Sequence, residues 1–438
     1  MVAENEKERG LIIVSNRLPL SVKEENGSYK SSLSSGGLVT ALSGLTKSTN
    51  FRWFGWPGKA IKDPAQQKMI SDALAENSAV GIFLDEQLAH DHYNKFSNSV
   101  LWPILHYQSG VAFNEDAWKA YQRVNEIFAD TVASEANTGD FIWVHDYHLL
   151  LLPSLLRERL EKQGKHCPIG FTLHTPFPAE DFWGANAEKE GQVQYEGHES
   201  CVATFVVGID PQKFNVSMQD PDVQKRIHEL EKLYENTTVI IGVDRLEYTK
   251  GLVQKLEGYE HFLKAYPDLQ GKVTLIQVAV PSSEDVKEYQ DLENDISTLV
   301  GKINGEHATA DGTPLIYIHR PIPFTELTAL YCVADICLLT SRRDGMNLVA
   351  SEYVACQANK HGVLVLSELA GAASFMSGGS VTFHPSSVQE LSDAAHKALT
   401  MDEKEKKERY EELRGFITTH KAGYTNFRCS AAGLTTVL

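Results

Sequence analysis

Two successive series of short apolar runs, each alternating with longer amphipathic runs, dominate this 438-residue chain. In the first half the apolar runs are residues 11–14, 141–144 and 169–173, and helical patterns cover 118–133 and 149–162. Apolar runs of strand length that alternate with helical segments predict a parallel sheet with helices on both faces. The first half is therefore expected to form an α/β domain.

The second half repeats this plan. Strands are predicted at 238–243, 272–280, 315–319, 336–340 and 363–366, and helices at 254–265, 283–303, 324–334 and 348–358. We expect two doubly wound domains, at 1–207 and 208–400, followed by a helical tail at 401–438. Residues 401–414 of this tail are dense in Glu and Lys and are predicted to form a solvated helix. Ligands of such domains bind at the carboxyl ends of the strands.

Charge and composition exclude several classes of partner. The formal charge of −17 argues against nucleic acid and against an anionic membrane surface. No apolar run is long enough to span a bilayer, and the charged N-terminus lacks a signal-peptide core. The six cysteines are scattered without a C-x-x-C pair, which favours free thiols and a cytoplasmic protein. A phosphorylated ligand would need a local cluster of Arg and Lys.

The stretch Ser341-Arg342-Arg343-Asp344-Gly345-Met346-Asn347-Leu348-Val349-Ala350-Ser351-Glu352 follows one of these buried strands and opens a helix. Free N–H groups at a helix N-terminus attract anions. Asp344 and Glu352 could accept hydrogen bonds from sugar hydroxyls, which suggests a nucleotide that carries a sugar. An ordinary strand-to-helix turn is an equally good interpretation of these residues taken alone.

Two cations follow the first strand of the second half. Arg245 and Lys250 are five positions apart across a turn, so both could converge on a diphosphate and offset the charge of a nucleotide leaving group. No Asp-x-Asp motif lies nearby, which suits a transferase without a metal. The alternative is a solvated pair of cations.

Polar side chains also end the strands of the first half. Arg17 could grip a phosphate, Asp146 could accept a hydrogen bond from a sugar hydroxyl, and His174 stands beside two prolines that stiffen its loop. His145 and His148 have no third ligand at helical spacing, so a metal site is disfavoured.

A glycine pair, Gly36 and Gly37, precedes another helical stretch and would let the backbone approach a phosphate or a sugar. The chain has neither G-x-G-x-x-G nor G-x-x-x-x-G-K-[ST], so nicotinamide enzymes and P-loop NTPases lose support. A plain loop is the alternative for this pair.

Together, and in this order, these motifs resemble the trehalose-6-phosphate synthases of glycosyltransferase family 20, in a fungal-type form. The matching stretches are VSNRLPL, SSGGL, FGWPG, YNKFSNSVLWP, WVHDYHLL, LHTPFP, VDRLEYTKG and RDGMNLVASEY, and they cover the chain from Leu11 to about residue 400.

The resemblance implies a GT-B fold, with two Rossmann-like domains facing each other across a cleft. It also implies a retaining transfer of glucose from UDP-glucose to glucose 6-phosphate, giving trehalose 6-phosphate and UDP without a metal or other cofactor. The expected partners are those two substrates and either further copies of the chain or a complex with a phosphatase and regulatory subunits.

The resemblance also assigns residues. The catalytic set would be His174, Asp146, Arg245, Lys250 and Asp344. UDP-glucose would be bound by Gly36, Gly37, Arg245, Lys250, Ile322, Asp344, Gly345, Met346, Asn347, Leu348, Val349, Ala350, Ser351 and Glu352. Glucose 6-phosphate would be bound by Arg17, Trp56, Tyr93, Trp102 and Asp146.

Two features depart from the family pattern. Ser283 stands where the family has a phosphate-binding arginine, and only 34 positions separate His174 from Gly208, so the first domain is shortened near residues 180–200. These departures leave two alternatives open. One is a catalytically impaired regulatory subunit of a trehalose synthase complex that keeps UDP-glucose binding, and the other is a related enzyme with a different acceptor.

Overall fold

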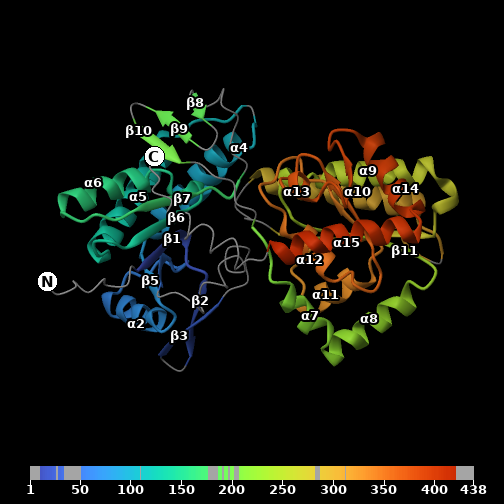
Figure 1. Cartoon of the computed structure of the whole chain (residues 1–438), viewed down its shortest axis with the longest axis horizontal. Coiled ribbons are helices and arrows are strands. Elements are labelled where there is room, and N and C mark those ends of the chain that lie inside the picture. Colours follow the sequence, from blue (N-terminus) through green and yellow to red (C-terminus); the bar gives the residue numbers. More distant parts are fainter. Residues whose placement is uncertain are drawn as a thin grey trace. The chain divides into compact units, whose positions relative to one another are not determined.

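The computed structural model describes residues 10–25, 28–33, 51–108, 110–175, 186–189, 192–195, 198–201, 207–281, 287–310 and 312–420. The chain divides into two compact units, with the boundary between residues 205 and 206. Figure 1 shows that each unit is built on a parallel sheet with helices on its faces. The two α/β domains expected from the sequence are therefore present.

Unit 1 contains a five-stranded parallel sheet in the order β5-β4-β1-β6-β7. Its strands are β1 (Leu11–Arg17), β4 (Phe51–Trp56), β5 (Ala79–Gly81), β6 (Phe141–His145) and β7 (Ile169–Thr172). Its helices are α2 (Pro64–Ala75), α3 (Glu86–His90), the π-helix η2 (Asp91–Leu101), α4 (Trp102–Leu105), α5 (Glu115–Glu135), the 3-10 turn η3 (Tyr147–Leu149) and α6 (Leu152–Lys162).

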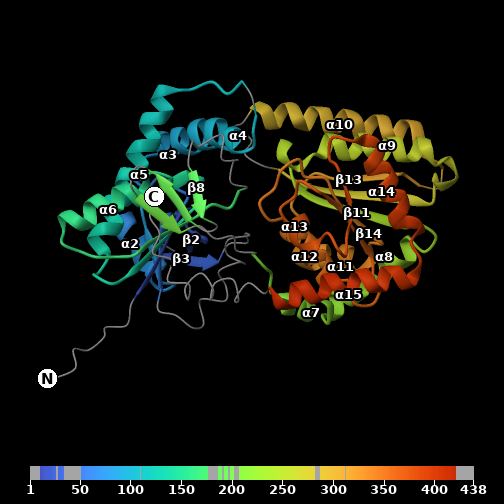
Figure 2. The same cartoon turned by 45° about the horizontal axis from the view of Figure 1, so that its top comes forward.

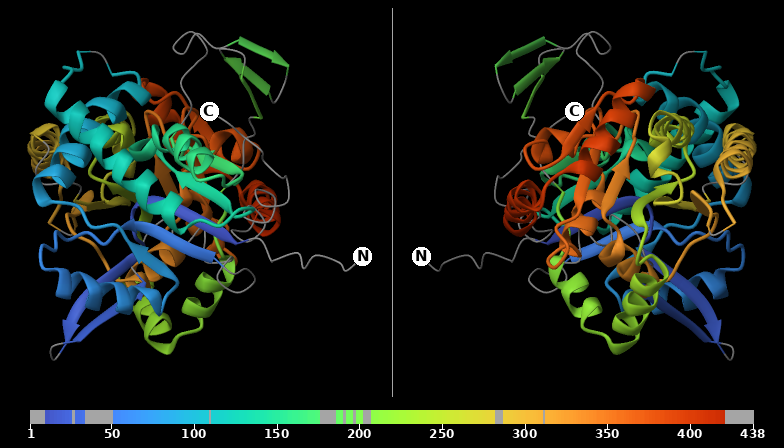
Figure 3. Two further views of the ribbon diagram at one scale, coloured as in Figure 1. Left: turned by 90° about the vertical axis from the view of Figure 1, so that its left-hand side faces the viewer. Right: turned by 90° about the vertical axis from the view of Figure 1, so that its right-hand side faces the viewer.

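Alternation of side chains along β1 explains how both faces of this sheet are covered. Ile12 and Val14 point to one face and pack with buried residues of α5 and α6. Leu11 and Ile13 point to the other face and pack with α2. The antiparallel hairpin of β2 (Leu20–Glu25) and β3 (Ser28–Leu33) extends beyond the sheet in Figure 3.

A second, small sheet follows β7 in the chain. Its antiparallel strands are β8 (Asn186–Lys189), β9 (Gln192–Tyr195) and β10 (His198–Cys201), in the order β10-β9-β8. These strands lie in the segment that the sequence indicates to be short. In the described part of the chain, β7 pairs with β6 alone and so forms an edge of the main sheet.

Unit 2 contains a six-stranded parallel sheet in the order β13-β12-β11-β14-β15-β16. Its strands are β11 (Thr238–Arg245), β12 (Val273–Val280), β13 (Leu315–Ile318), β14 (Ile336–Leu339), β15 (Val363–Ser367) and β16 (Val381–Phe383). Its helices are α7 (Pro211–Met218), α8 (Pro221–Leu233), α9 (Leu252–Ala265), α10 (Lys287–His307), α11 (Phe324–Val333), α12 (Leu348–Ala355), α13 (Ala373–Met376), α14 (Val388–Thr400) and α15 (Glu403–Thr419), with 3-10 turns η5 (Tyr248–Lys250) and η6 (Pro267–Leu269).

The two faces of this sheet carry separate cores. Figure 2 shows helices on either side of its strands. Val239 and Ile241 of β11 pack with buried residues of α7, α8, α11, α12 and α15. Ile240, between them, points the other way and packs with α9, α10 and α14. Both faces of the strand are buried, which is why β11 reads as a continuous apolar run in the sequence.

The strands and helices that the sequence predicts in both halves are all present, within a few residues at their ends. The charged tail also forms a helix, α15, but it is more than a solvated one, because Tyr410, Leu413 and Ile417 are buried in the core of unit 2. In the described part of the chain, no helix is long and apolar enough to cross a bilayer.

Candidate functional site

The strand order of each unit marks where a ligand can bind. In unit 2 the chain runs from β11 outward to β13 and then returns to β14, so the order reverses between β11 and β14. In unit 1 the same reversal falls between β1 and β6. Loops that leave neighbouring strands in opposite directions form a crevice at the carboxyl edge, where open α/β sheets bind ligands.

In unit 2 the loops at this reversal bring Lys250 and Asp344 into contact. The Nζ of Lys250, which follows β11, lies 2.6 Å from Oδ2 of Asp344, which follows β14, and each side chain is 13% exposed. Ser341 and Asn347 donate to the same carboxylate oxygen, at 3.2 and 3.3 Å. Lys250 and the acid loop that the sequence selects are therefore in direct contact.

Gly251 allows these two loops to approach so closely. Its φ is +65°, and a Cβ at this position would lie 2.2 Å from the carbonyl oxygen of Thr340. The Thr340 hydroxyl donates to the carbonyls of Lys250 and Gly251, both at 3.1 Å, and Arg342 N–H donates to the carbonyl of Thr249 at 2.8 Å. Only glycine combines this conformation with this contact.

The electrostatics keep Asp344 ionised. Burial by itself would raise the pKa of Asp344, but the charge and hydrogen bond of Lys250, the Asn347 amide and the charge of Arg245 outweigh it, so the pKa lies below its usual value. Arg245 also pairs with Glu247 at 2.9 Å and is 59% exposed. The site thus holds one buried ion pair and one cation whose side chain reaches solvent.

The first turn of α12 presents its main chain rather than its side chains. Asn347 caps the helix, because its Oδ1 accepts from the N–H of Ala350 at 3.3 Å. The side chains of Ala350 and Ser351 are buried, at 0% and 1% exposure. Any contact of these two residues with a donor would therefore be made by the main chain, and their assignment to the donor stays a prediction.

The other residues predicted for the donor lie around this edge. Gly345 continues the Asp344 loop, and the partly buried side chains that pack against the core are Ile322, Met346, Leu348 and Val349. Gly36, Gly37 and Ser283 lie outside the described residues.

Glu352 lies one turn into α12, where the Tyr331 hydroxyl of α11 donates to its Oε2 at 3.1 Å. Burial raises the pKa of Glu352, and the Tyr331 hydrogen bond and the charge of Lys213 reverse only part of this shift. Glu352 is partly buried and has no ion-pair partner among the described residues, so its oxygens could accept further hydrogen bonds from hydroxyl groups.

This raised pKa predicts a pH-dependent stability. Below the usual value of 4.5, Glu352 is protonated in both the folded and the unfolded chain. As the pH rises, the unfolded chain loses the proton first, so Glu352 lowers the free energy of unfolding until its folded pKa is passed. We expect the stability of Glu352→Gln relative to wild type to increase over this range and then level off, as measured by urea unfolding at a series of pH values.

The exposed Glu411 supplies a matched control, because its Oε1 lies 3.9 Å from Lys407 on the surface of α15. Glu411→Gln should follow the wild-type pH dependence. A Glu352→Gln curve parallel to wild type at all pH values would contradict the role given to burial.

In unit 1, Arg17 and Trp56 meet at the carboxyl edge of the sheet. Arg17 ends β1 and is in register with Trp56 at the end of β4. The guanidinium carbon lies 5.9 Å from the centre of the indole ring. Arg17 is exposed, whereas the buried Nε1 of Trp56 has no acceptor among the described residues. An arginine held against an aromatic ring in this way can present its fork to an anion.

Asp146 follows β6 in a strained conformation, with φ +76° and ψ 166°. Its N–H donates to the carbonyl of Thr172 at 2.7 Å, and its Oδ1 accepts from the N–H of His174 at 3.3 Å. Backbone strain of this kind in a residue other than glycine is typical of functional sites.

Aromatic rings surround Asp146. The His148 Nδ1 lies 3.8 Å from the carboxylate of Asp146, and the His148 ring stacks on that of Tyr93 with centroids 5.4 Å apart. Trp102 contacts the ring of Tyr147 at 5.4 Å, and its buried Nε1 also has no acceptor among the described residues. Contacts with His148 and Tyr147 of the η3 turn therefore link Tyr93, Trp102 and Asp146, three of the residues that the resemblance assigns to the acceptor.

His174 lies beside His145, a residue that sequence analysis considered only as a metal ligand. The Nδ1 of His145 is 3.0 Å from the Nε2 of His174, and the two rings stack with centroids 5.3 Å apart. The sequence feature that could have drawn attention to His145 is the pair of histidines around the end of β6. Tyr331 was missed altogether, because nothing near it in the sequence shows that α11 faces Glu352.

One group of possible metal ligands exists in the described part of the chain, away from these residues. Glu260, Glu306 and His307 bring ligand-type atoms within 4.8 Å of one another. However, Lys264 and Lys302 both pair with Glu260, and Lys264 also lies 3.2 Å from Glu306. Two ammonium groups already offset these carboxylates, so we interpret the group as an ion-pair network between α9 and α10.

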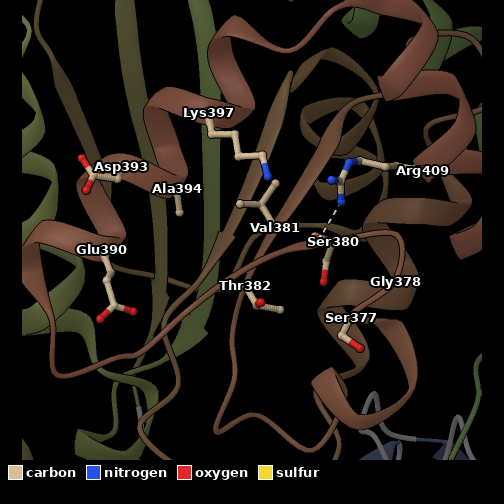
Figure 4. Close-up of a pocket in the computed structure, with 10 residues that line it drawn as sticks. All are labelled: Ser377, Gly378, Ser380, Val381, Thr382, Glu390, Asp393, Ala394, Lys397 and Arg409. Atoms are coloured by element: carbon tan, nitrogen blue, oxygen red, sulfur yellow. Dashed lines mark hydrogen bonds between the residues drawn. The ribbon is translucent and has the colours of Figure 1, made fainter.

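A surface hollow of about 480 Å³ lies between β16, α14 and α15. Figure 4 shows the residues that line it. Its walls carry both charges, with Lys397 and Arg409 opposite Glu390 and Asp393. Arg409 is held by the carbonyl of Ser380 at 3.0 Å and by Glu405 at 2.8 Å. None of the residues predicted for either substrate lines this hollow.

Comparison with known proteins gives a family for this geometry. Residues 9–185 and 182–426 match the sequence model of glycosyltransferase family 20. The two matched parts meet at residues 182–185, within the segment that the sequence indicates to be short.

Curated relatives are similar over nearly the whole chain. An alpha,alpha-trehalose-phosphate synthase [UDP-forming] of Botryotinia fuckeliana is 42% identical, over 94% of this chain and 86% of that protein. The alpha,alpha-trehalose-phosphate synthase [UDP-forming] 56 kDa subunit of Saccharomyces cerevisiae is 41% identical, over 94% of this chain and 92% of that protein.

Two solved structures are also similar to nearly the whole chain. An Escherichia coli structure described as trehalose-6-phosphate bound with UDP-2-fluoro glucose has a TM-score of 0.84 at 29% identity, covering 98% of this chain and 99% of that one. A Burkholderia xenovorans alpha,alpha-trehalose-phosphate synthase (UDP-forming) in complex with glucose-6-phosphate has a TM-score of 0.83 at 26% identity, covering 97% and 99%.

Proposed function

The chain belongs to glycosyltransferase family 20, and on that basis we propose that it is a retaining glucosyltransferase of the GT-B class that moves glucose from UDP-glucose to glucose 6-phosphate. The products are trehalose 6-phosphate and UDP. The observation that carries this proposal is the meeting of Arg245, Lys250 and Asp344 at the strand reversal of unit 2.

The donor side follows from this charge arrangement. Lys250 has three N–H donors and, among the described residues, uses one on Asp344, so the other two could bond to the oxygens of a diphosphate. Arg245 adds a second, solvent-accessible cation. Both would stabilise the negative charge that develops on UDP as the glycosidic bond breaks. Asp344 would accept hydrogen bonds from glucose hydroxyls, and Glu352 from the ribose.

The acceptor side rests on unit 1. Arg17 and Tyr93 would hold the phosphate of glucose 6-phosphate, and Asp146 would orient its sugar. The buried Nε1 atoms of Trp56 and Trp102 support this assignment, since indole N–H groups without an acceptor are rare and a sugar or phosphate oxygen would satisfy them.

Retention can be explained by a front-face displacement. The acceptor hydroxyl attacks the anomeric carbon on the side from which UDP leaves, and a phosphate oxygen of UDP accepts its proton. Catalysis then depends on positioning and on electrostatic stabilisation. Because the two cations offset the leaving-group charge, we propose that the reaction needs no metal. We further propose that the chain works in the cytoplasm, as a homo-oligomer or in a complex with a phosphatase and regulatory subunits.

The regulatory alternative is not favoured. The curated relatives are named as UDP-forming synthases, and this chain matches 86% and 92% of the length of the two described above. The decisive assay measures UDP release from UDP-glucose. We expect release only with glucose 6-phosphate, and not with glucose. UDP release that does not depend on glucose 6-phosphate, or no release at saturating acceptor, would contradict the proposal.

Arg17→Ala is expected to raise the KM for glucose 6-phosphate by about 10- to 100-fold, because one charge-assisted contact with the phosphate is lost. The KM for UDP-glucose should be unchanged. Arg52 is a matched control, because its guanidinium also lies over an aromatic ring, 5.5 Å from that of Phe54, but at the start of β4. Arg52→Ala should leave both KM values unchanged. Equal effects of the two variants would show that Arg17 acts only through the fold.

A further inference from the structure

Two imidazole rings form a hydrogen-bonded pair at the carboxyl edge of the sheet in unit 1. His145 ends β6 and is in register with Thr172, which ends β7 two residues before His174. The His145 Nδ1 and the His174 Nε2 are 3.0 Å apart, and the ring planes differ by 14°. His145 is 1% exposed, whereas His174 is partly exposed, so the pair runs from the buried end of β6 toward the surface.

A hydrogen bond between two ring nitrogens needs one proton, and the surroundings indicate which ring supplies it. Burial lowers the pKa of His145 well below its usual value, so this ring is neutral and carries a single proton. Its Nε2 is buried and has no partner among the described residues. A proton there would be a buried donor without an acceptor, which is the costlier arrangement.

The proton of His145 therefore belongs on Nδ1, from which it is donated to the Nε2 of His174. The Nε2 of His174 then acts as the acceptor, so the one proton of the neutral His174 ring must be on its own Nδ1. The His174 backbone is fixed as well, by the bond from its N–H to Asp146.

We propose that His145 is a positioning residue that holds His174 as the neutral Nδ1–H tautomer, with Nδ1 as the hydrogen-bond donor that faces the donor glucose. This proposal rests on the proposed function, together with the family resemblance that assigns His174 to the catalytic set. Positive charge develops at the anomeric carbon in glycosyl transfer. A neutral donor can orient a sugar hydroxyl there without adding a second positive charge.

The test is a heteronuclear NMR measurement of the two ring nitrogens of His174 in the full chain labelled at histidine. The wild type should show a proton on Nδ1. In His145→Asn the side-chain amide takes the place of Nδ1 as a donor, so the Nδ1–H tautomer should persist. In His145→Phe the donor is lost, and the proton should move to Nε2, the usual tautomer of free histidine.

His92 supplies the matched control, because its ring is also 1% exposed and in unit 1, but bonds to the carbonyl of His148 at 3.0 Å. His92→Phe should leave the tautomer of His174 unchanged. An Nε2–H tautomer in the wild type, or an Nδ1–H tautomer that survives in His145→Phe, would overturn the proposal. If His145→Phe does not fold, the wild type and His145→Asn still decide.

Kinetics separate this proposal from the proposed function. His145→Phe should lower kcat about tenfold, because one oriented hydrogen bond is lost, and should leave the KM for glucose 6-phosphate unchanged. His145→Asn should retain most of the wild-type kcat. A kcat unaffected in His145→Phe would refute the positioning role. A wild-type chain that does not turn over UDP-glucose would refute the proposed function, whereas the NMR result would still decide the tautomer.

Discussion

Replacing Lys250 with alanine is expected to lower kcat/KM for UDP-glucose by about a thousandfold, as the loss of a positioned donor for developing negative charge does in other enzymes. Lys250 reaches its position through its bond to Asp344, and no other lysine among the residues proposed for the donor could replace it. The measurement is the initial rate of UDP release at saturating glucose 6-phosphate.

Loss of the ammonium also leaves Asp344 buried without its cation, so stability must be measured in parallel. The double variant Lys250→Ala/Asp344→Asn removes both charges and should recover thermal stability but not activity. Lys264→Ala, which removes an exposed lysine of α9, is the control and should retain the wild-type rate. A Lys250→Ala enzyme within tenfold of wild type would rule out the leaving-group role.

The largest loss of stability is expected from Lys255→Met. The Nζ of Lys255 lies 2.5 Å from Oδ2 of Asp244, both side chains are fully buried, and Gln277 donates to the same oxygen at 3.0 Å. Removing one partner leaves a buried charge without compensation, which costs about 3–5 kcal/mol. Chemical denaturation monitored by circular dichroism gives the free energy of unfolding.

The double variant Asp244→Asn/Lys255→Met should recover most of this loss, because replacing both charges of a buried pair is often close to neutral. Lys264→Met removes a half-exposed lysine and leaves Lys302 paired with Glu260, so it should change stability little. If the double variant is as unstable as Lys255→Met, the cost lies in packing rather than in the uncompensated charge.

The sequence predicted the parts of this protein that depend on local pattern. The strand that ends at Arg245 is buried on both faces and reads as apolar, and the loop at Asp344 lies between a buried strand and a helix. Since parallel strands place their carboxyl ends at one edge, the grouping of Lys250 with Asp344 followed from the order of elements.

Contacts between elements distant in the sequence could not be predicted in the same way. Lys255 occupies a helix in which a lysine normally faces solvent, and its burial depends on Gly242, where a Cβ would lie 2.7 Å from the lysine Nζ. The pairing of Tyr331 with Glu352 and of His145 with His174 depends on how α11 packs on α12 and β6 on β7. Neither spacing nor composition records these arrangements.

The ion pair of Lys250 with Asp344 has a consequence for selectivity. An ammonium that already rests on a carboxylate offers little net attraction to a small free anion such as inorganic phosphate, and the overall charge of −17 repels it further. A ligand that brings hydroxyl groups for the carboxylate together with phosphates for the ammonium satisfies both partners at once. If the proposed function holds, we expect the pair to favour whole sugar nucleotides over the abundant phosphates of the cell.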